Sequence, residues 1–179
     1  MSGRSHHGYR DGKEGPRDSG AGGTGVRSNS RPKRTLVVGV GNLLLKDEGV
    51  GIHAVRRLEQ MQLPDHVQLI DAGTSAIDFI SDIQNADKVI FVDAVKAGGE
   101  PGSIYRLTKE DIAARTGSQL SLHEIGVLEA LNMAECLGGC GEVVIIGIEP
   151  KEMTWGMELS SELESKLPEL IECVLTEIG

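Results

Sequence analysis

Apolar runs of strand length alternate with segments of helical spacing, and this alternation constrains the fold more than any other feature. The run Thr35–Gly41 (TLVVGVG) is rich in β-branched residues, as expected for a strand covered on both faces. Further strands are predicted at Val67–Asp71 and Lys88–Asp93, with helices over Asp47–Met61 and Ser75–Ile83 between them. This β-α-β-α-β order predicts a parallel sheet with right-handed crossovers and helices on both faces.

The second half of the chain departs from this regular order. A short strand at Ser103–Leu107 follows the third strand after a link of about ten residues, too short for a crossover helix, so it should run antiparallel. A polar stretch, Thr108–Ser121, leads to a helix over His123–Leu137, a last strand at Glu142–Ile148 and a closing helix at Glu162–Ile178. The prediction is a three-layer α/β/α sandwich around a mostly parallel sheet.

Residues 1–34 differ in composition from the rest of the chain. They contain eight of the 24 glycines and few large apolar side chains, so we expect a disordered basic tail before an α/β domain at residues 35–179. A basic docking arm is the alternative. Because this tail carries eight basic and three acidic groups and the whole chain has a net charge of −9, residues 35–179 carry −14. A domain this acidic excludes nucleic acid as its partner.

Compartment and assembly are predicted from what the sequence lacks. No stretch approaches the roughly 20 apolar residues of a membrane span, and no apolar segment follows the first basic residues as in a signal peptide. Three cysteines are too few for a secreted disulfide framework. We therefore expect a cytoplasmic protein without a membrane span, and a monomer, since no distinctive apolar stripe suggests self-association.

Acidic residues follow two strands that are predicted to be neighbours. In an open α/β sheet, ligands bind at the carboxyl ends of the strands. Asp47 and Glu48 follow the first strand, Asp93 ends the third, and His123 begins the helix before the last strand. Two carboxylates and an imidazole suit nickel, zinc or copper, and three protein ligands leave positions open for substrate. Taken singly, these residues have ordinary roles, such as an acid near a helix N-terminus.

Other functional motifs are incomplete. The turn Gly39-Val-Gly41 has Leu44 where a dinucleotide fingerprint needs its third glycine, and no P-loop lysine pattern occurs. The chain also has neither a Gly-x-Ser-x-Gly elbow nor a His-Glu-x-x-His helix. Cys136 and Cys140 lack a second metal-binding pair and are expected to be free thiols, and His53 and His66 are expected to face solvent.

The ordered set of motifs resembles one family, the maturation endopeptidases of nickel–iron hydrogenases. The segments that carry the resemblance are Leu36–Gly51, Asp71-Ala-Gly-Thr74, Val92-Asp93-Ala94, Pro101-Gly102, His123 and Gly147-Ile-Glu-Pro150. The resemblance implies a five-stranded sheet of order 2-1-3-5-4 with strand four antiparallel. It also implies a metal-binding triad of Glu48, Asp93 and His123, and we expect Asn42, Asp71, Gly73 and Thr74 to contact the substrate.

Members of this family remove a short C-terminal extension from the hydrogenase large-subunit precursor once nickel has been inserted. The resemblance thus implies a nickel-loaded precursor as partner and the substrate's own nickel as the recognised ion, for which zinc or another divalent ion could substitute. The nickel would either polarise the scissile carbonyl or serve for docking, with Glu48 or Asp93 as general base. Two alternatives are a nickel-sensing chaperone or adaptor without hydrolytic activity, and an enzyme that acts on another precursor or a small amide.

Overall fold

The computed structural model describes residues 33–114 and 122–179, and the side chains of 122–124 are not described. The predicted tail, residues 1–34, lies almost wholly outside the described part. The described residues belong to one compact unit. Within this part of the chain, no helix has both the length and the apolar character needed to cross a membrane.

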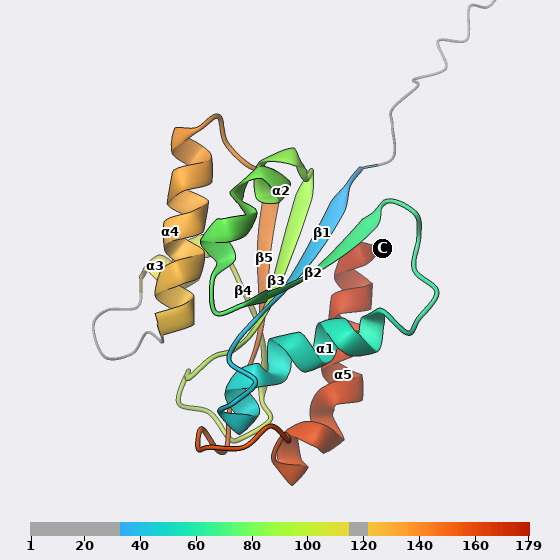
Figure 1. Cartoon of the computed structure of the whole chain (residues 1–179), viewed down its shortest axis with the longest axis vertical. Helices are drawn as coiled ribbons and strands as arrows, with labels where there is room; N and C mark the ends of the chain where they lie inside the picture. The colour runs from blue at the N-terminus through green and yellow to red at the C-terminus, as the bar shows by residue number, and fades with distance from the viewer. Residues whose placement is uncertain (1–32, 115–121) are drawn as a thin grey trace, which may run out of the picture. The chain divides into compact units, whose positions relative to one another are not determined.

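The sheet has the predicted order and directions (Figure 1). Its neighbours run β2-β1-β3-β5-β4, and β4 pairs antiparallel with β5 while the other three pairs are parallel. The strands are β1 (Thr35–Val40), β2 (Val67–Gly73), β3 (Lys88–Ala94), β4 (Ile104–Leu107) and β5 (Glu142–Ile148). The fold-class prediction is therefore confirmed, including the antiparallel fourth strand.

Helices cover both faces of this sheet, as Figure 1 shows. One face carries α1 and α5, which contact each other, and the other carries α2 and α4. The helical elements are η1 (Lys46–Gly49), α1 (Val50–Leu58), η2 (Ala76–Phe79), α2 (Ile80–Asn85), α3 (Lys109–Ala113), α4 (Leu122–Cys136) and α5 (Ser161–Ile178). Here η marks a 3₁₀ helix, and η1 and η2 form the first turns of the two helices predicted from Asp47 and Ser75.

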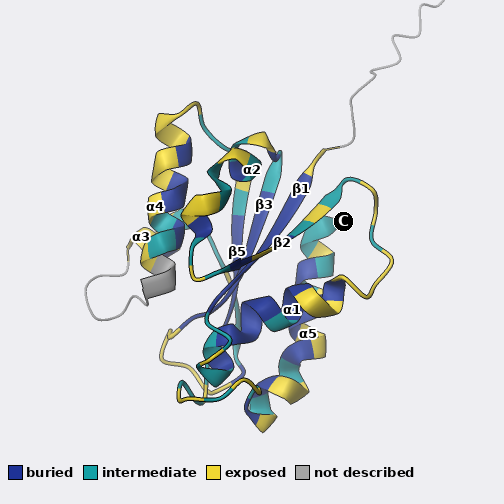
Figure 2. Ribbon diagram, in the orientation of Figure 1, coloured by how far each residue is buried: buried dark blue, intermediate teal, exposed yellow. Residues whose placement is uncertain are grey.

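The two faces of the sheet have separate apolar cores, and β3 contributes to both because successive side chains alternate between faces. Val89 and Phe91 pack in the core beneath α2 and α4, whereas Ile90 and Val92 pack in the core beneath α1 and α5. Figure 2 shows the central strands as buried. The same alternation places the side chain of Asp93 on the α4 face, at the carboxyl end of β3.

The polar stretch Thr108–Ser121 contains a helix that was not predicted. Thr108 caps α3, because its hydroxyl accepts from the Asp111 N–H at 3.2 Å and the Asp111 carboxylate accepts from the Thr108 N–H at 2.7 Å. This reciprocal capping box stabilises a helix that only Ile112 anchors in the core. The remainder of that stretch lies outside the described residues.

Candidate functional site

The turn after β1 places Glu48 at the carboxyl edge of the sheet. Gly41 has φ +145°, and a Cβ there would lie 2.0 Å from the carbonyl oxygen of Glu48. The Asn42 N–H donates to this same oxygen at 3.2 Å. Only glycine permits so close an approach, so Gly41 fixes the position of η1 against the end of β1.

The segment that carries Glu48 also packs against β3. Element η1 contacts this strand, and α1 begins so close to it that a Cβ on Gly51 would lie 2.1 Å from the Val92 carbonyl oxygen. Val92 directly precedes Asp93. Glu48, which is half-buried, and Asp93 are therefore carried by backbone segments that meet at the carboxyl ends of β1 and β3, where the connections diverge to opposite faces.

The Asp93 carboxylate is held inside the α4 face of the sheet. The residue is 2 % exposed, and its Oδ1 accepts the Ala94 N–H at 2.8 Å. It lines a cavity together with apolar residues from β3, α3, α4 and β5, namely Phe91, Ile112, Val127 and Ile145. A volume of about 10 Å³ is barely enough for one water molecule, so this cavity admits no larger ligand to the carboxylate.

The course of α4 places His123 toward the same edge. Val127 lies beside Asp93, whereas Ala134, farther along the helix, accepts a hydrogen bond from Gln84 of α2 at 3.4 Å. Going backward along α4 from Ala134 to Val127 therefore leads toward the carboxyl ends of the strands. His123 precedes Val127 by one helical turn. Its side chain lies outside the described atoms.

For the predicted triad, the structure describes only the backbone segments that carry its three residues. The structure brings together the segments that carry Glu48 and Asp93, and it directs the first turn of α4 toward them. Among the residues whose side chains are described, no three histidine, cysteine or acidic side chains form a group that could hold a metal ion. The triad stays a prediction, because that set does not include His123.

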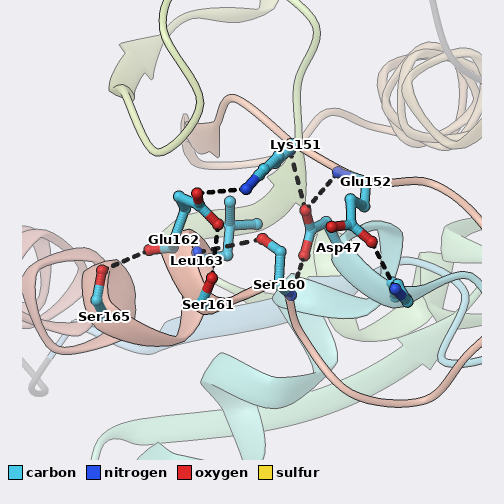
Figure 3. Close-up of polar contacts among 9 residues, drawn as sticks. Asp47, Lys151, Glu152, Ser160, Ser161, Glu162, Leu163 and Ser165 are labelled. Carbon is cyan, nitrogen blue, oxygen red and sulfur yellow. Dashed lines mark hydrogen bonds and ion pairs between the residues drawn. The ribbon is translucent and has the colours of Figure 1, made fainter.

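Asp47, the other acid of this turn, holds the backbone of a distant loop. It is completely buried, and its Oδ2 accepts the N–H groups of Lys151 and Glu152 at 2.9 and 2.7 Å (Figure 3). Its Oδ1 accepts the Ser160 N–H at 2.7 Å. Burying a carboxylate is costly unless donors surround it, and these three amides satisfy that need. Of the two adjacent acids, Asp47 is thus structural.

Further backbone bonds join the 150–160 loop to the turn that carries Glu48. The Asp47 N–H donates to the Glu152 carbonyl at 3.1 Å, and the Lys46 N–H donates to the Gly156 carbonyl at 2.8 Å. The Gly156 N–H in turn donates to the Leu44 carbonyl at 3.0 Å. Lys46 also forms an ion pair with Glu152 and has φ +48°, unusual for a residue with a side chain. The turn and the loop form one fixed unit.

Glu149 holds a second loop at the same edge of the sheet. It is 7 % exposed, and its Oε2 accepts the N–H groups of Ala97 and Gly99 at 2.8 and 3.2 Å and the Tyr105 hydroxyl at 2.9 Å. Burial of the hydroxyl and the adjacent Glu149 carboxylate raise the pKa of Tyr105. Sequence reasoning missed this role, although the motif Gly147-Ile-Glu-Pro150 contains the residue.

The four residues predicted to contact substrate lie in two adjacent turns. The Gly41 N–H donates to the Gly73 carbonyl at 2.8 Å, which joins the turn after β1 to the turn after β2. Asn42 Oδ1 accepts the Leu44 N–H at 3.0 Å, and Asp71 Oδ1 accepts the Gly73 N–H at 3.0 Å. Thr74 is exposed. The polar side chains of Asn42 and Asp71 thus shape their own turns, and their contact with substrate stays a prediction.

The remaining histidine and cysteine predictions have mixed outcomes. Cys136 and Cys140 are free thiols, as expected. His53 and His66, which were expected to face solvent, are both half-buried. His53 Nε2 lies 3.2 Å from the Met157 carbonyl oxygen, because the loop after β5 folds back over α1.

Comparisons with known proteins decide the family. A family model described as hydrogenase maturation protease matches residues 52–177. HupD of Bradyrhizobium diazoefficiens, a hydrogenase expression/formation protein, is 33% identical over 159 residues, which cover 85% of this chain and 83% of HupD. The chain belongs to the hydrogenase maturation protease family.

Solved structures of this protease family share the fold as well. The hydrogenase maturating endopeptidase HybD from E. coli superimposes with a TM-score of 0.73 at 28% identity, covering 81% of this chain and 91% of HybD. The hydrogenase 2 maturation protease of E. coli K12 is 32% identical in sequence, over 79% of this chain and 88% of that protein. Because relatives across the family are named proteases and endopeptidases, the chain is a peptidase.

Proposed function

We propose that this peptidase removes the C-terminal extension of a nickel–iron hydrogenase large-subunit precursor after nickel has been inserted. The observation that carries the proposal is the meeting of the Glu48 and Asp93 segments at the carboxyl ends of β1 and β3, toward which α4 directs His123. A pure adaptor is disfavoured by the protease names of the relatives.

The nickel belongs to the substrate in this proposal. Carboxylate oxygens and an imidazole nitrogen are ligands that nickel accepts, and three of them leave room for the precursor's own ligands. Glu48, Asp93 and His123 would complete the coordination of a nickel ion that the precursor presents at the sheet edge. Such a site discriminates loaded from empty precursor, because two carboxylates close together repel each other when no cation lies between them.

The two acids differ in accessibility, and this difference assigns their roles. Asp93 is buried and its Oδ1 is occupied by the Ala94 N–H, so its orientation is fixed before substrate arrives. Glu48 is half-buried and is reached from solvent. We therefore assign Asp93 to nickel recognition alone. Glu48 has two roles: one carboxylate oxygen is a ligand of the nickel, and the other is the general base that takes a proton from the attacking water.

The decisive experiment mixes the purified protein with nickel-loaded precursor and follows the precursor mass. We expect loss of the C-terminal peptide with the wild-type chain, and no cleavage of nickel-free precursor. Glu48→Gln and Asp93→Asn should each slow cleavage by about 10²-fold or more, the contribution expected of a general base or a positioned ligand. Glu59→Gln, at an exposed position just after α1, is the matched control. Wild-type rates for both site variants would refute the proposal, and unchanged precursor mass with the wild-type chain would favour an adaptor.

We also propose a reducing, cytoplasmic setting for this reaction. Support comes from the cysteines, all three of which are free. A thiolate-bound nickel in the precursor would require the same reducing conditions.

A further inference from the structure

The loop after β5 displays the chain's single tryptophan on the surface. Trp155 is 80 % exposed, and two other large apolar side chains lie in the same region, Leu44 at 50 % and Met157 at 59 %. A parallel bridge pairs Leu45 with Gly156, so the register places Leu44 level with Trp155. We call Leu44, Trp155 and Met157 the apolar patch. Contiguous exposed apolar side chains mark interaction sites on protein surfaces.

The loop that carries Trp155 and Met157 is held rigidly against the turn that carries Leu44. Asp47 accepts three of its backbone N–H groups, and Gly156 exchanges hydrogen bonds with the backbone of Leu44 and Lys46. His53 contacts the Met157 carbonyl. A tryptophan held in place on a fixed backbone loses little conformational freedom when a partner binds, which is the property of an interface anchor.

The apolar patch lies close to the candidate active site, because the Glu48 N–H donates to the carbonyl of Leu45, the neighbour of Leu44, at 3.2 Å. Leu44 precedes Glu48 by four positions, and the intervening Lys46 and Asp47 are the residues bonded to the loop. When the scissile bond of a bound polypeptide lies at Glu48, the substrate residues next to that bond can therefore reach the apolar patch.

Charge around the patch indicates what kind of partner fits. The two lysines beside it are neutralised, Lys46 by Glu152 and Lys151 by Glu162, whereas Glu158 is exposed and adds negative charge. Residues 35–179 as a whole carry −14, so a second copy of this chain would be repelled. The surface complements a segment with an apolar side chain next to basic ones.

We propose that the apolar patch is the docking surface for the substrate polypeptide, with Trp155 as its anchor, and that it binds an apolar, basic segment flanking the cleaved bond. This inference rests on the proposed function, since it names the part of the precursor that the same site holds. Trp155 is a specificity-determining residue in this view, whereas Glu48 and Asp93 act on the bond and the nickel.

The single tryptophan permits a direct test of docking. Protein that carries 5-fluorotryptophan gives one ¹⁹F signal, from Trp155, and the label is introduced into the Glu48→Gln variant so that the precursor stays intact. We expect this signal to shift or broaden when nickel-loaded precursor is added, and to stay unchanged with an acidic protein of similar size. An unchanged signal under conditions where the wild-type chain cleaves the precursor would overturn the proposal.

Cleavage kinetics provide the second measurement. Trp155→Ala should raise KM about tenfold and leave kcat nearly unchanged, because the lost contact aids binding rather than chemistry. Trp155→Phe should recover most of the loss. Leu137→Ala is the matched control, since Leu137 is 61 % exposed but lies beyond the end of α4. Glu158→Lys should also raise KM, and the effect should shrink as salt is added.

These outcomes separate the two proposals. A tryptophan signal that responds to a precursor which the wild-type chain does not cleave would support docking and refute the proposed peptidase reaction. Normal cleavage by Trp155→Ala with unchanged KM would refute docking and leave the peptidase reaction standing.

Discussion

The backbone N–H of Ser160 donates to Asp47 Oδ1 over 2.7 Å, although the two residues are 113 positions apart. Through this bond and those from the Lys151 and Glu152 amides, Asp47 joins the loop after β5 to the turn that carries Glu48. Asp47→Asn replaces one carboxylate oxygen, which accepts a hydrogen bond, by an NH₂ group. This NH₂ group then faces a backbone N–H, which is also a donor. We expect the free energy of unfolding to fall by about 3 kcal/mol, because a charged acceptor of buried N–H groups is lost.

Urea unfolding measures that change, and Asp65→Asn, at an exposed position, is its control. Hydrogen exchange at the amides of Lys151, Glu152 and Ser160 should accelerate in Asp47→Asn alone. Equal stability of the two variants would show that the loop is held by its other bonds.

Gly41→Ala tests whether the turn after β1 needs its glycine. The new Cβ meets both a positive φ and the Glu48 carbonyl oxygen 2.0 Å away, so the turn must shift and carry Glu48 with it. Gly138→Ala is a matched control, because Gly138 has φ +130° but no atom within 4 Å of its Cβ. The positive φ alone should lower the free energy of unfolding of both variants by about 1–2 kcal/mol. Gly41→Ala should lower it clearly further and abolish cleavage. Thermal unfolding and the precursor assay give the two readouts, and equal losses in both variants would contradict the role of Gly41.

Tyr105 should make the protein sensitive to alkali. Burial and the Glu149 carboxylate raise the pKa of this hydroxyl above its ordinary value of 10.0. The neutral form is thus favoured by folding, so the stability it contributes is complete below about pH 10 and is lost as pH rises through the higher pKa of the folded state. Glu149→Gln should lower the pKa of Tyr105, because the charge that opposes the phenolate is removed.

The phenolate absorbance of the folded protein measures this pKa. Tyr9 is the other tyrosine, so the titration is run in a Tyr9→Phe background, where Tyr105 alone responds. Glu100→Gln, at an exposed position of the loop that Glu149 holds, is the control and should leave the titration unchanged. A pKa of Tyr105 that is the same in Glu149→Gln and the parent would refute the coupling.

Glu177 should determine part of the stability at low pH. Its hydrogen bond from Arg106 Nε at 2.6 Å and its pairing with Lys88 lower the pKa of this carboxyl below the ordinary value of 4.5. The contribution of Glu177 to stability is therefore present above about pH 4.5 and is lost as pH falls through the lower pKa of the folded state. Arg106→Gln should raise the pKa of Glu177 and move acid unfolding to higher pH.

The carboxyl carbon shift of Glu177 through the titration, followed by NMR, checks this expectation. Arg57→Gln is the comparison, because Arg57 pairs with Glu164 at 3.4 Å on the exposed surface, where such pairs stabilise little. Acid unfolding at the same pH in both variants would show that Arg106 contributes no more than an ordinary surface charge.

The sheet was predictable because its central strands are continuous apolar runs that must be covered on both faces. The short link before Ile104 sufficed to reverse β4, since no crossover helix fits in it. Helix α3 was missed because it has little apolar periodicity, although Thr108 and Asp111 have the spacing of a capping box. That pattern would have revealed it.

The site was only partly predictable from the sequence. Strand ends located Glu48 and Asp93, because the carboxyl ends of parallel strands meet at one edge of a sheet. The strand-end argument could not separate the roles of Asp47 and Glu48, which are adjacent acids after the same strand, and only the resemblance to a family favoured Glu48. The difference arises from the Lys151, Glu152 and Ser160 amides, and which distant backbone groups a carboxylate meets depends on the folded loop.

The attachment of Asp47 to the loop after β5 also makes an early turn of the chain depend on residues that are synthesised late. Translation delivers Glu48 and Asp93 long before it delivers Ser160, so an emerging polypeptide has both acids while the turn that carries Glu48 is still unsupported. Domains generally fold as units during or after synthesis. We therefore expect the turn that carries Glu48 to become rigid only after residues up to Ser160 have been synthesised.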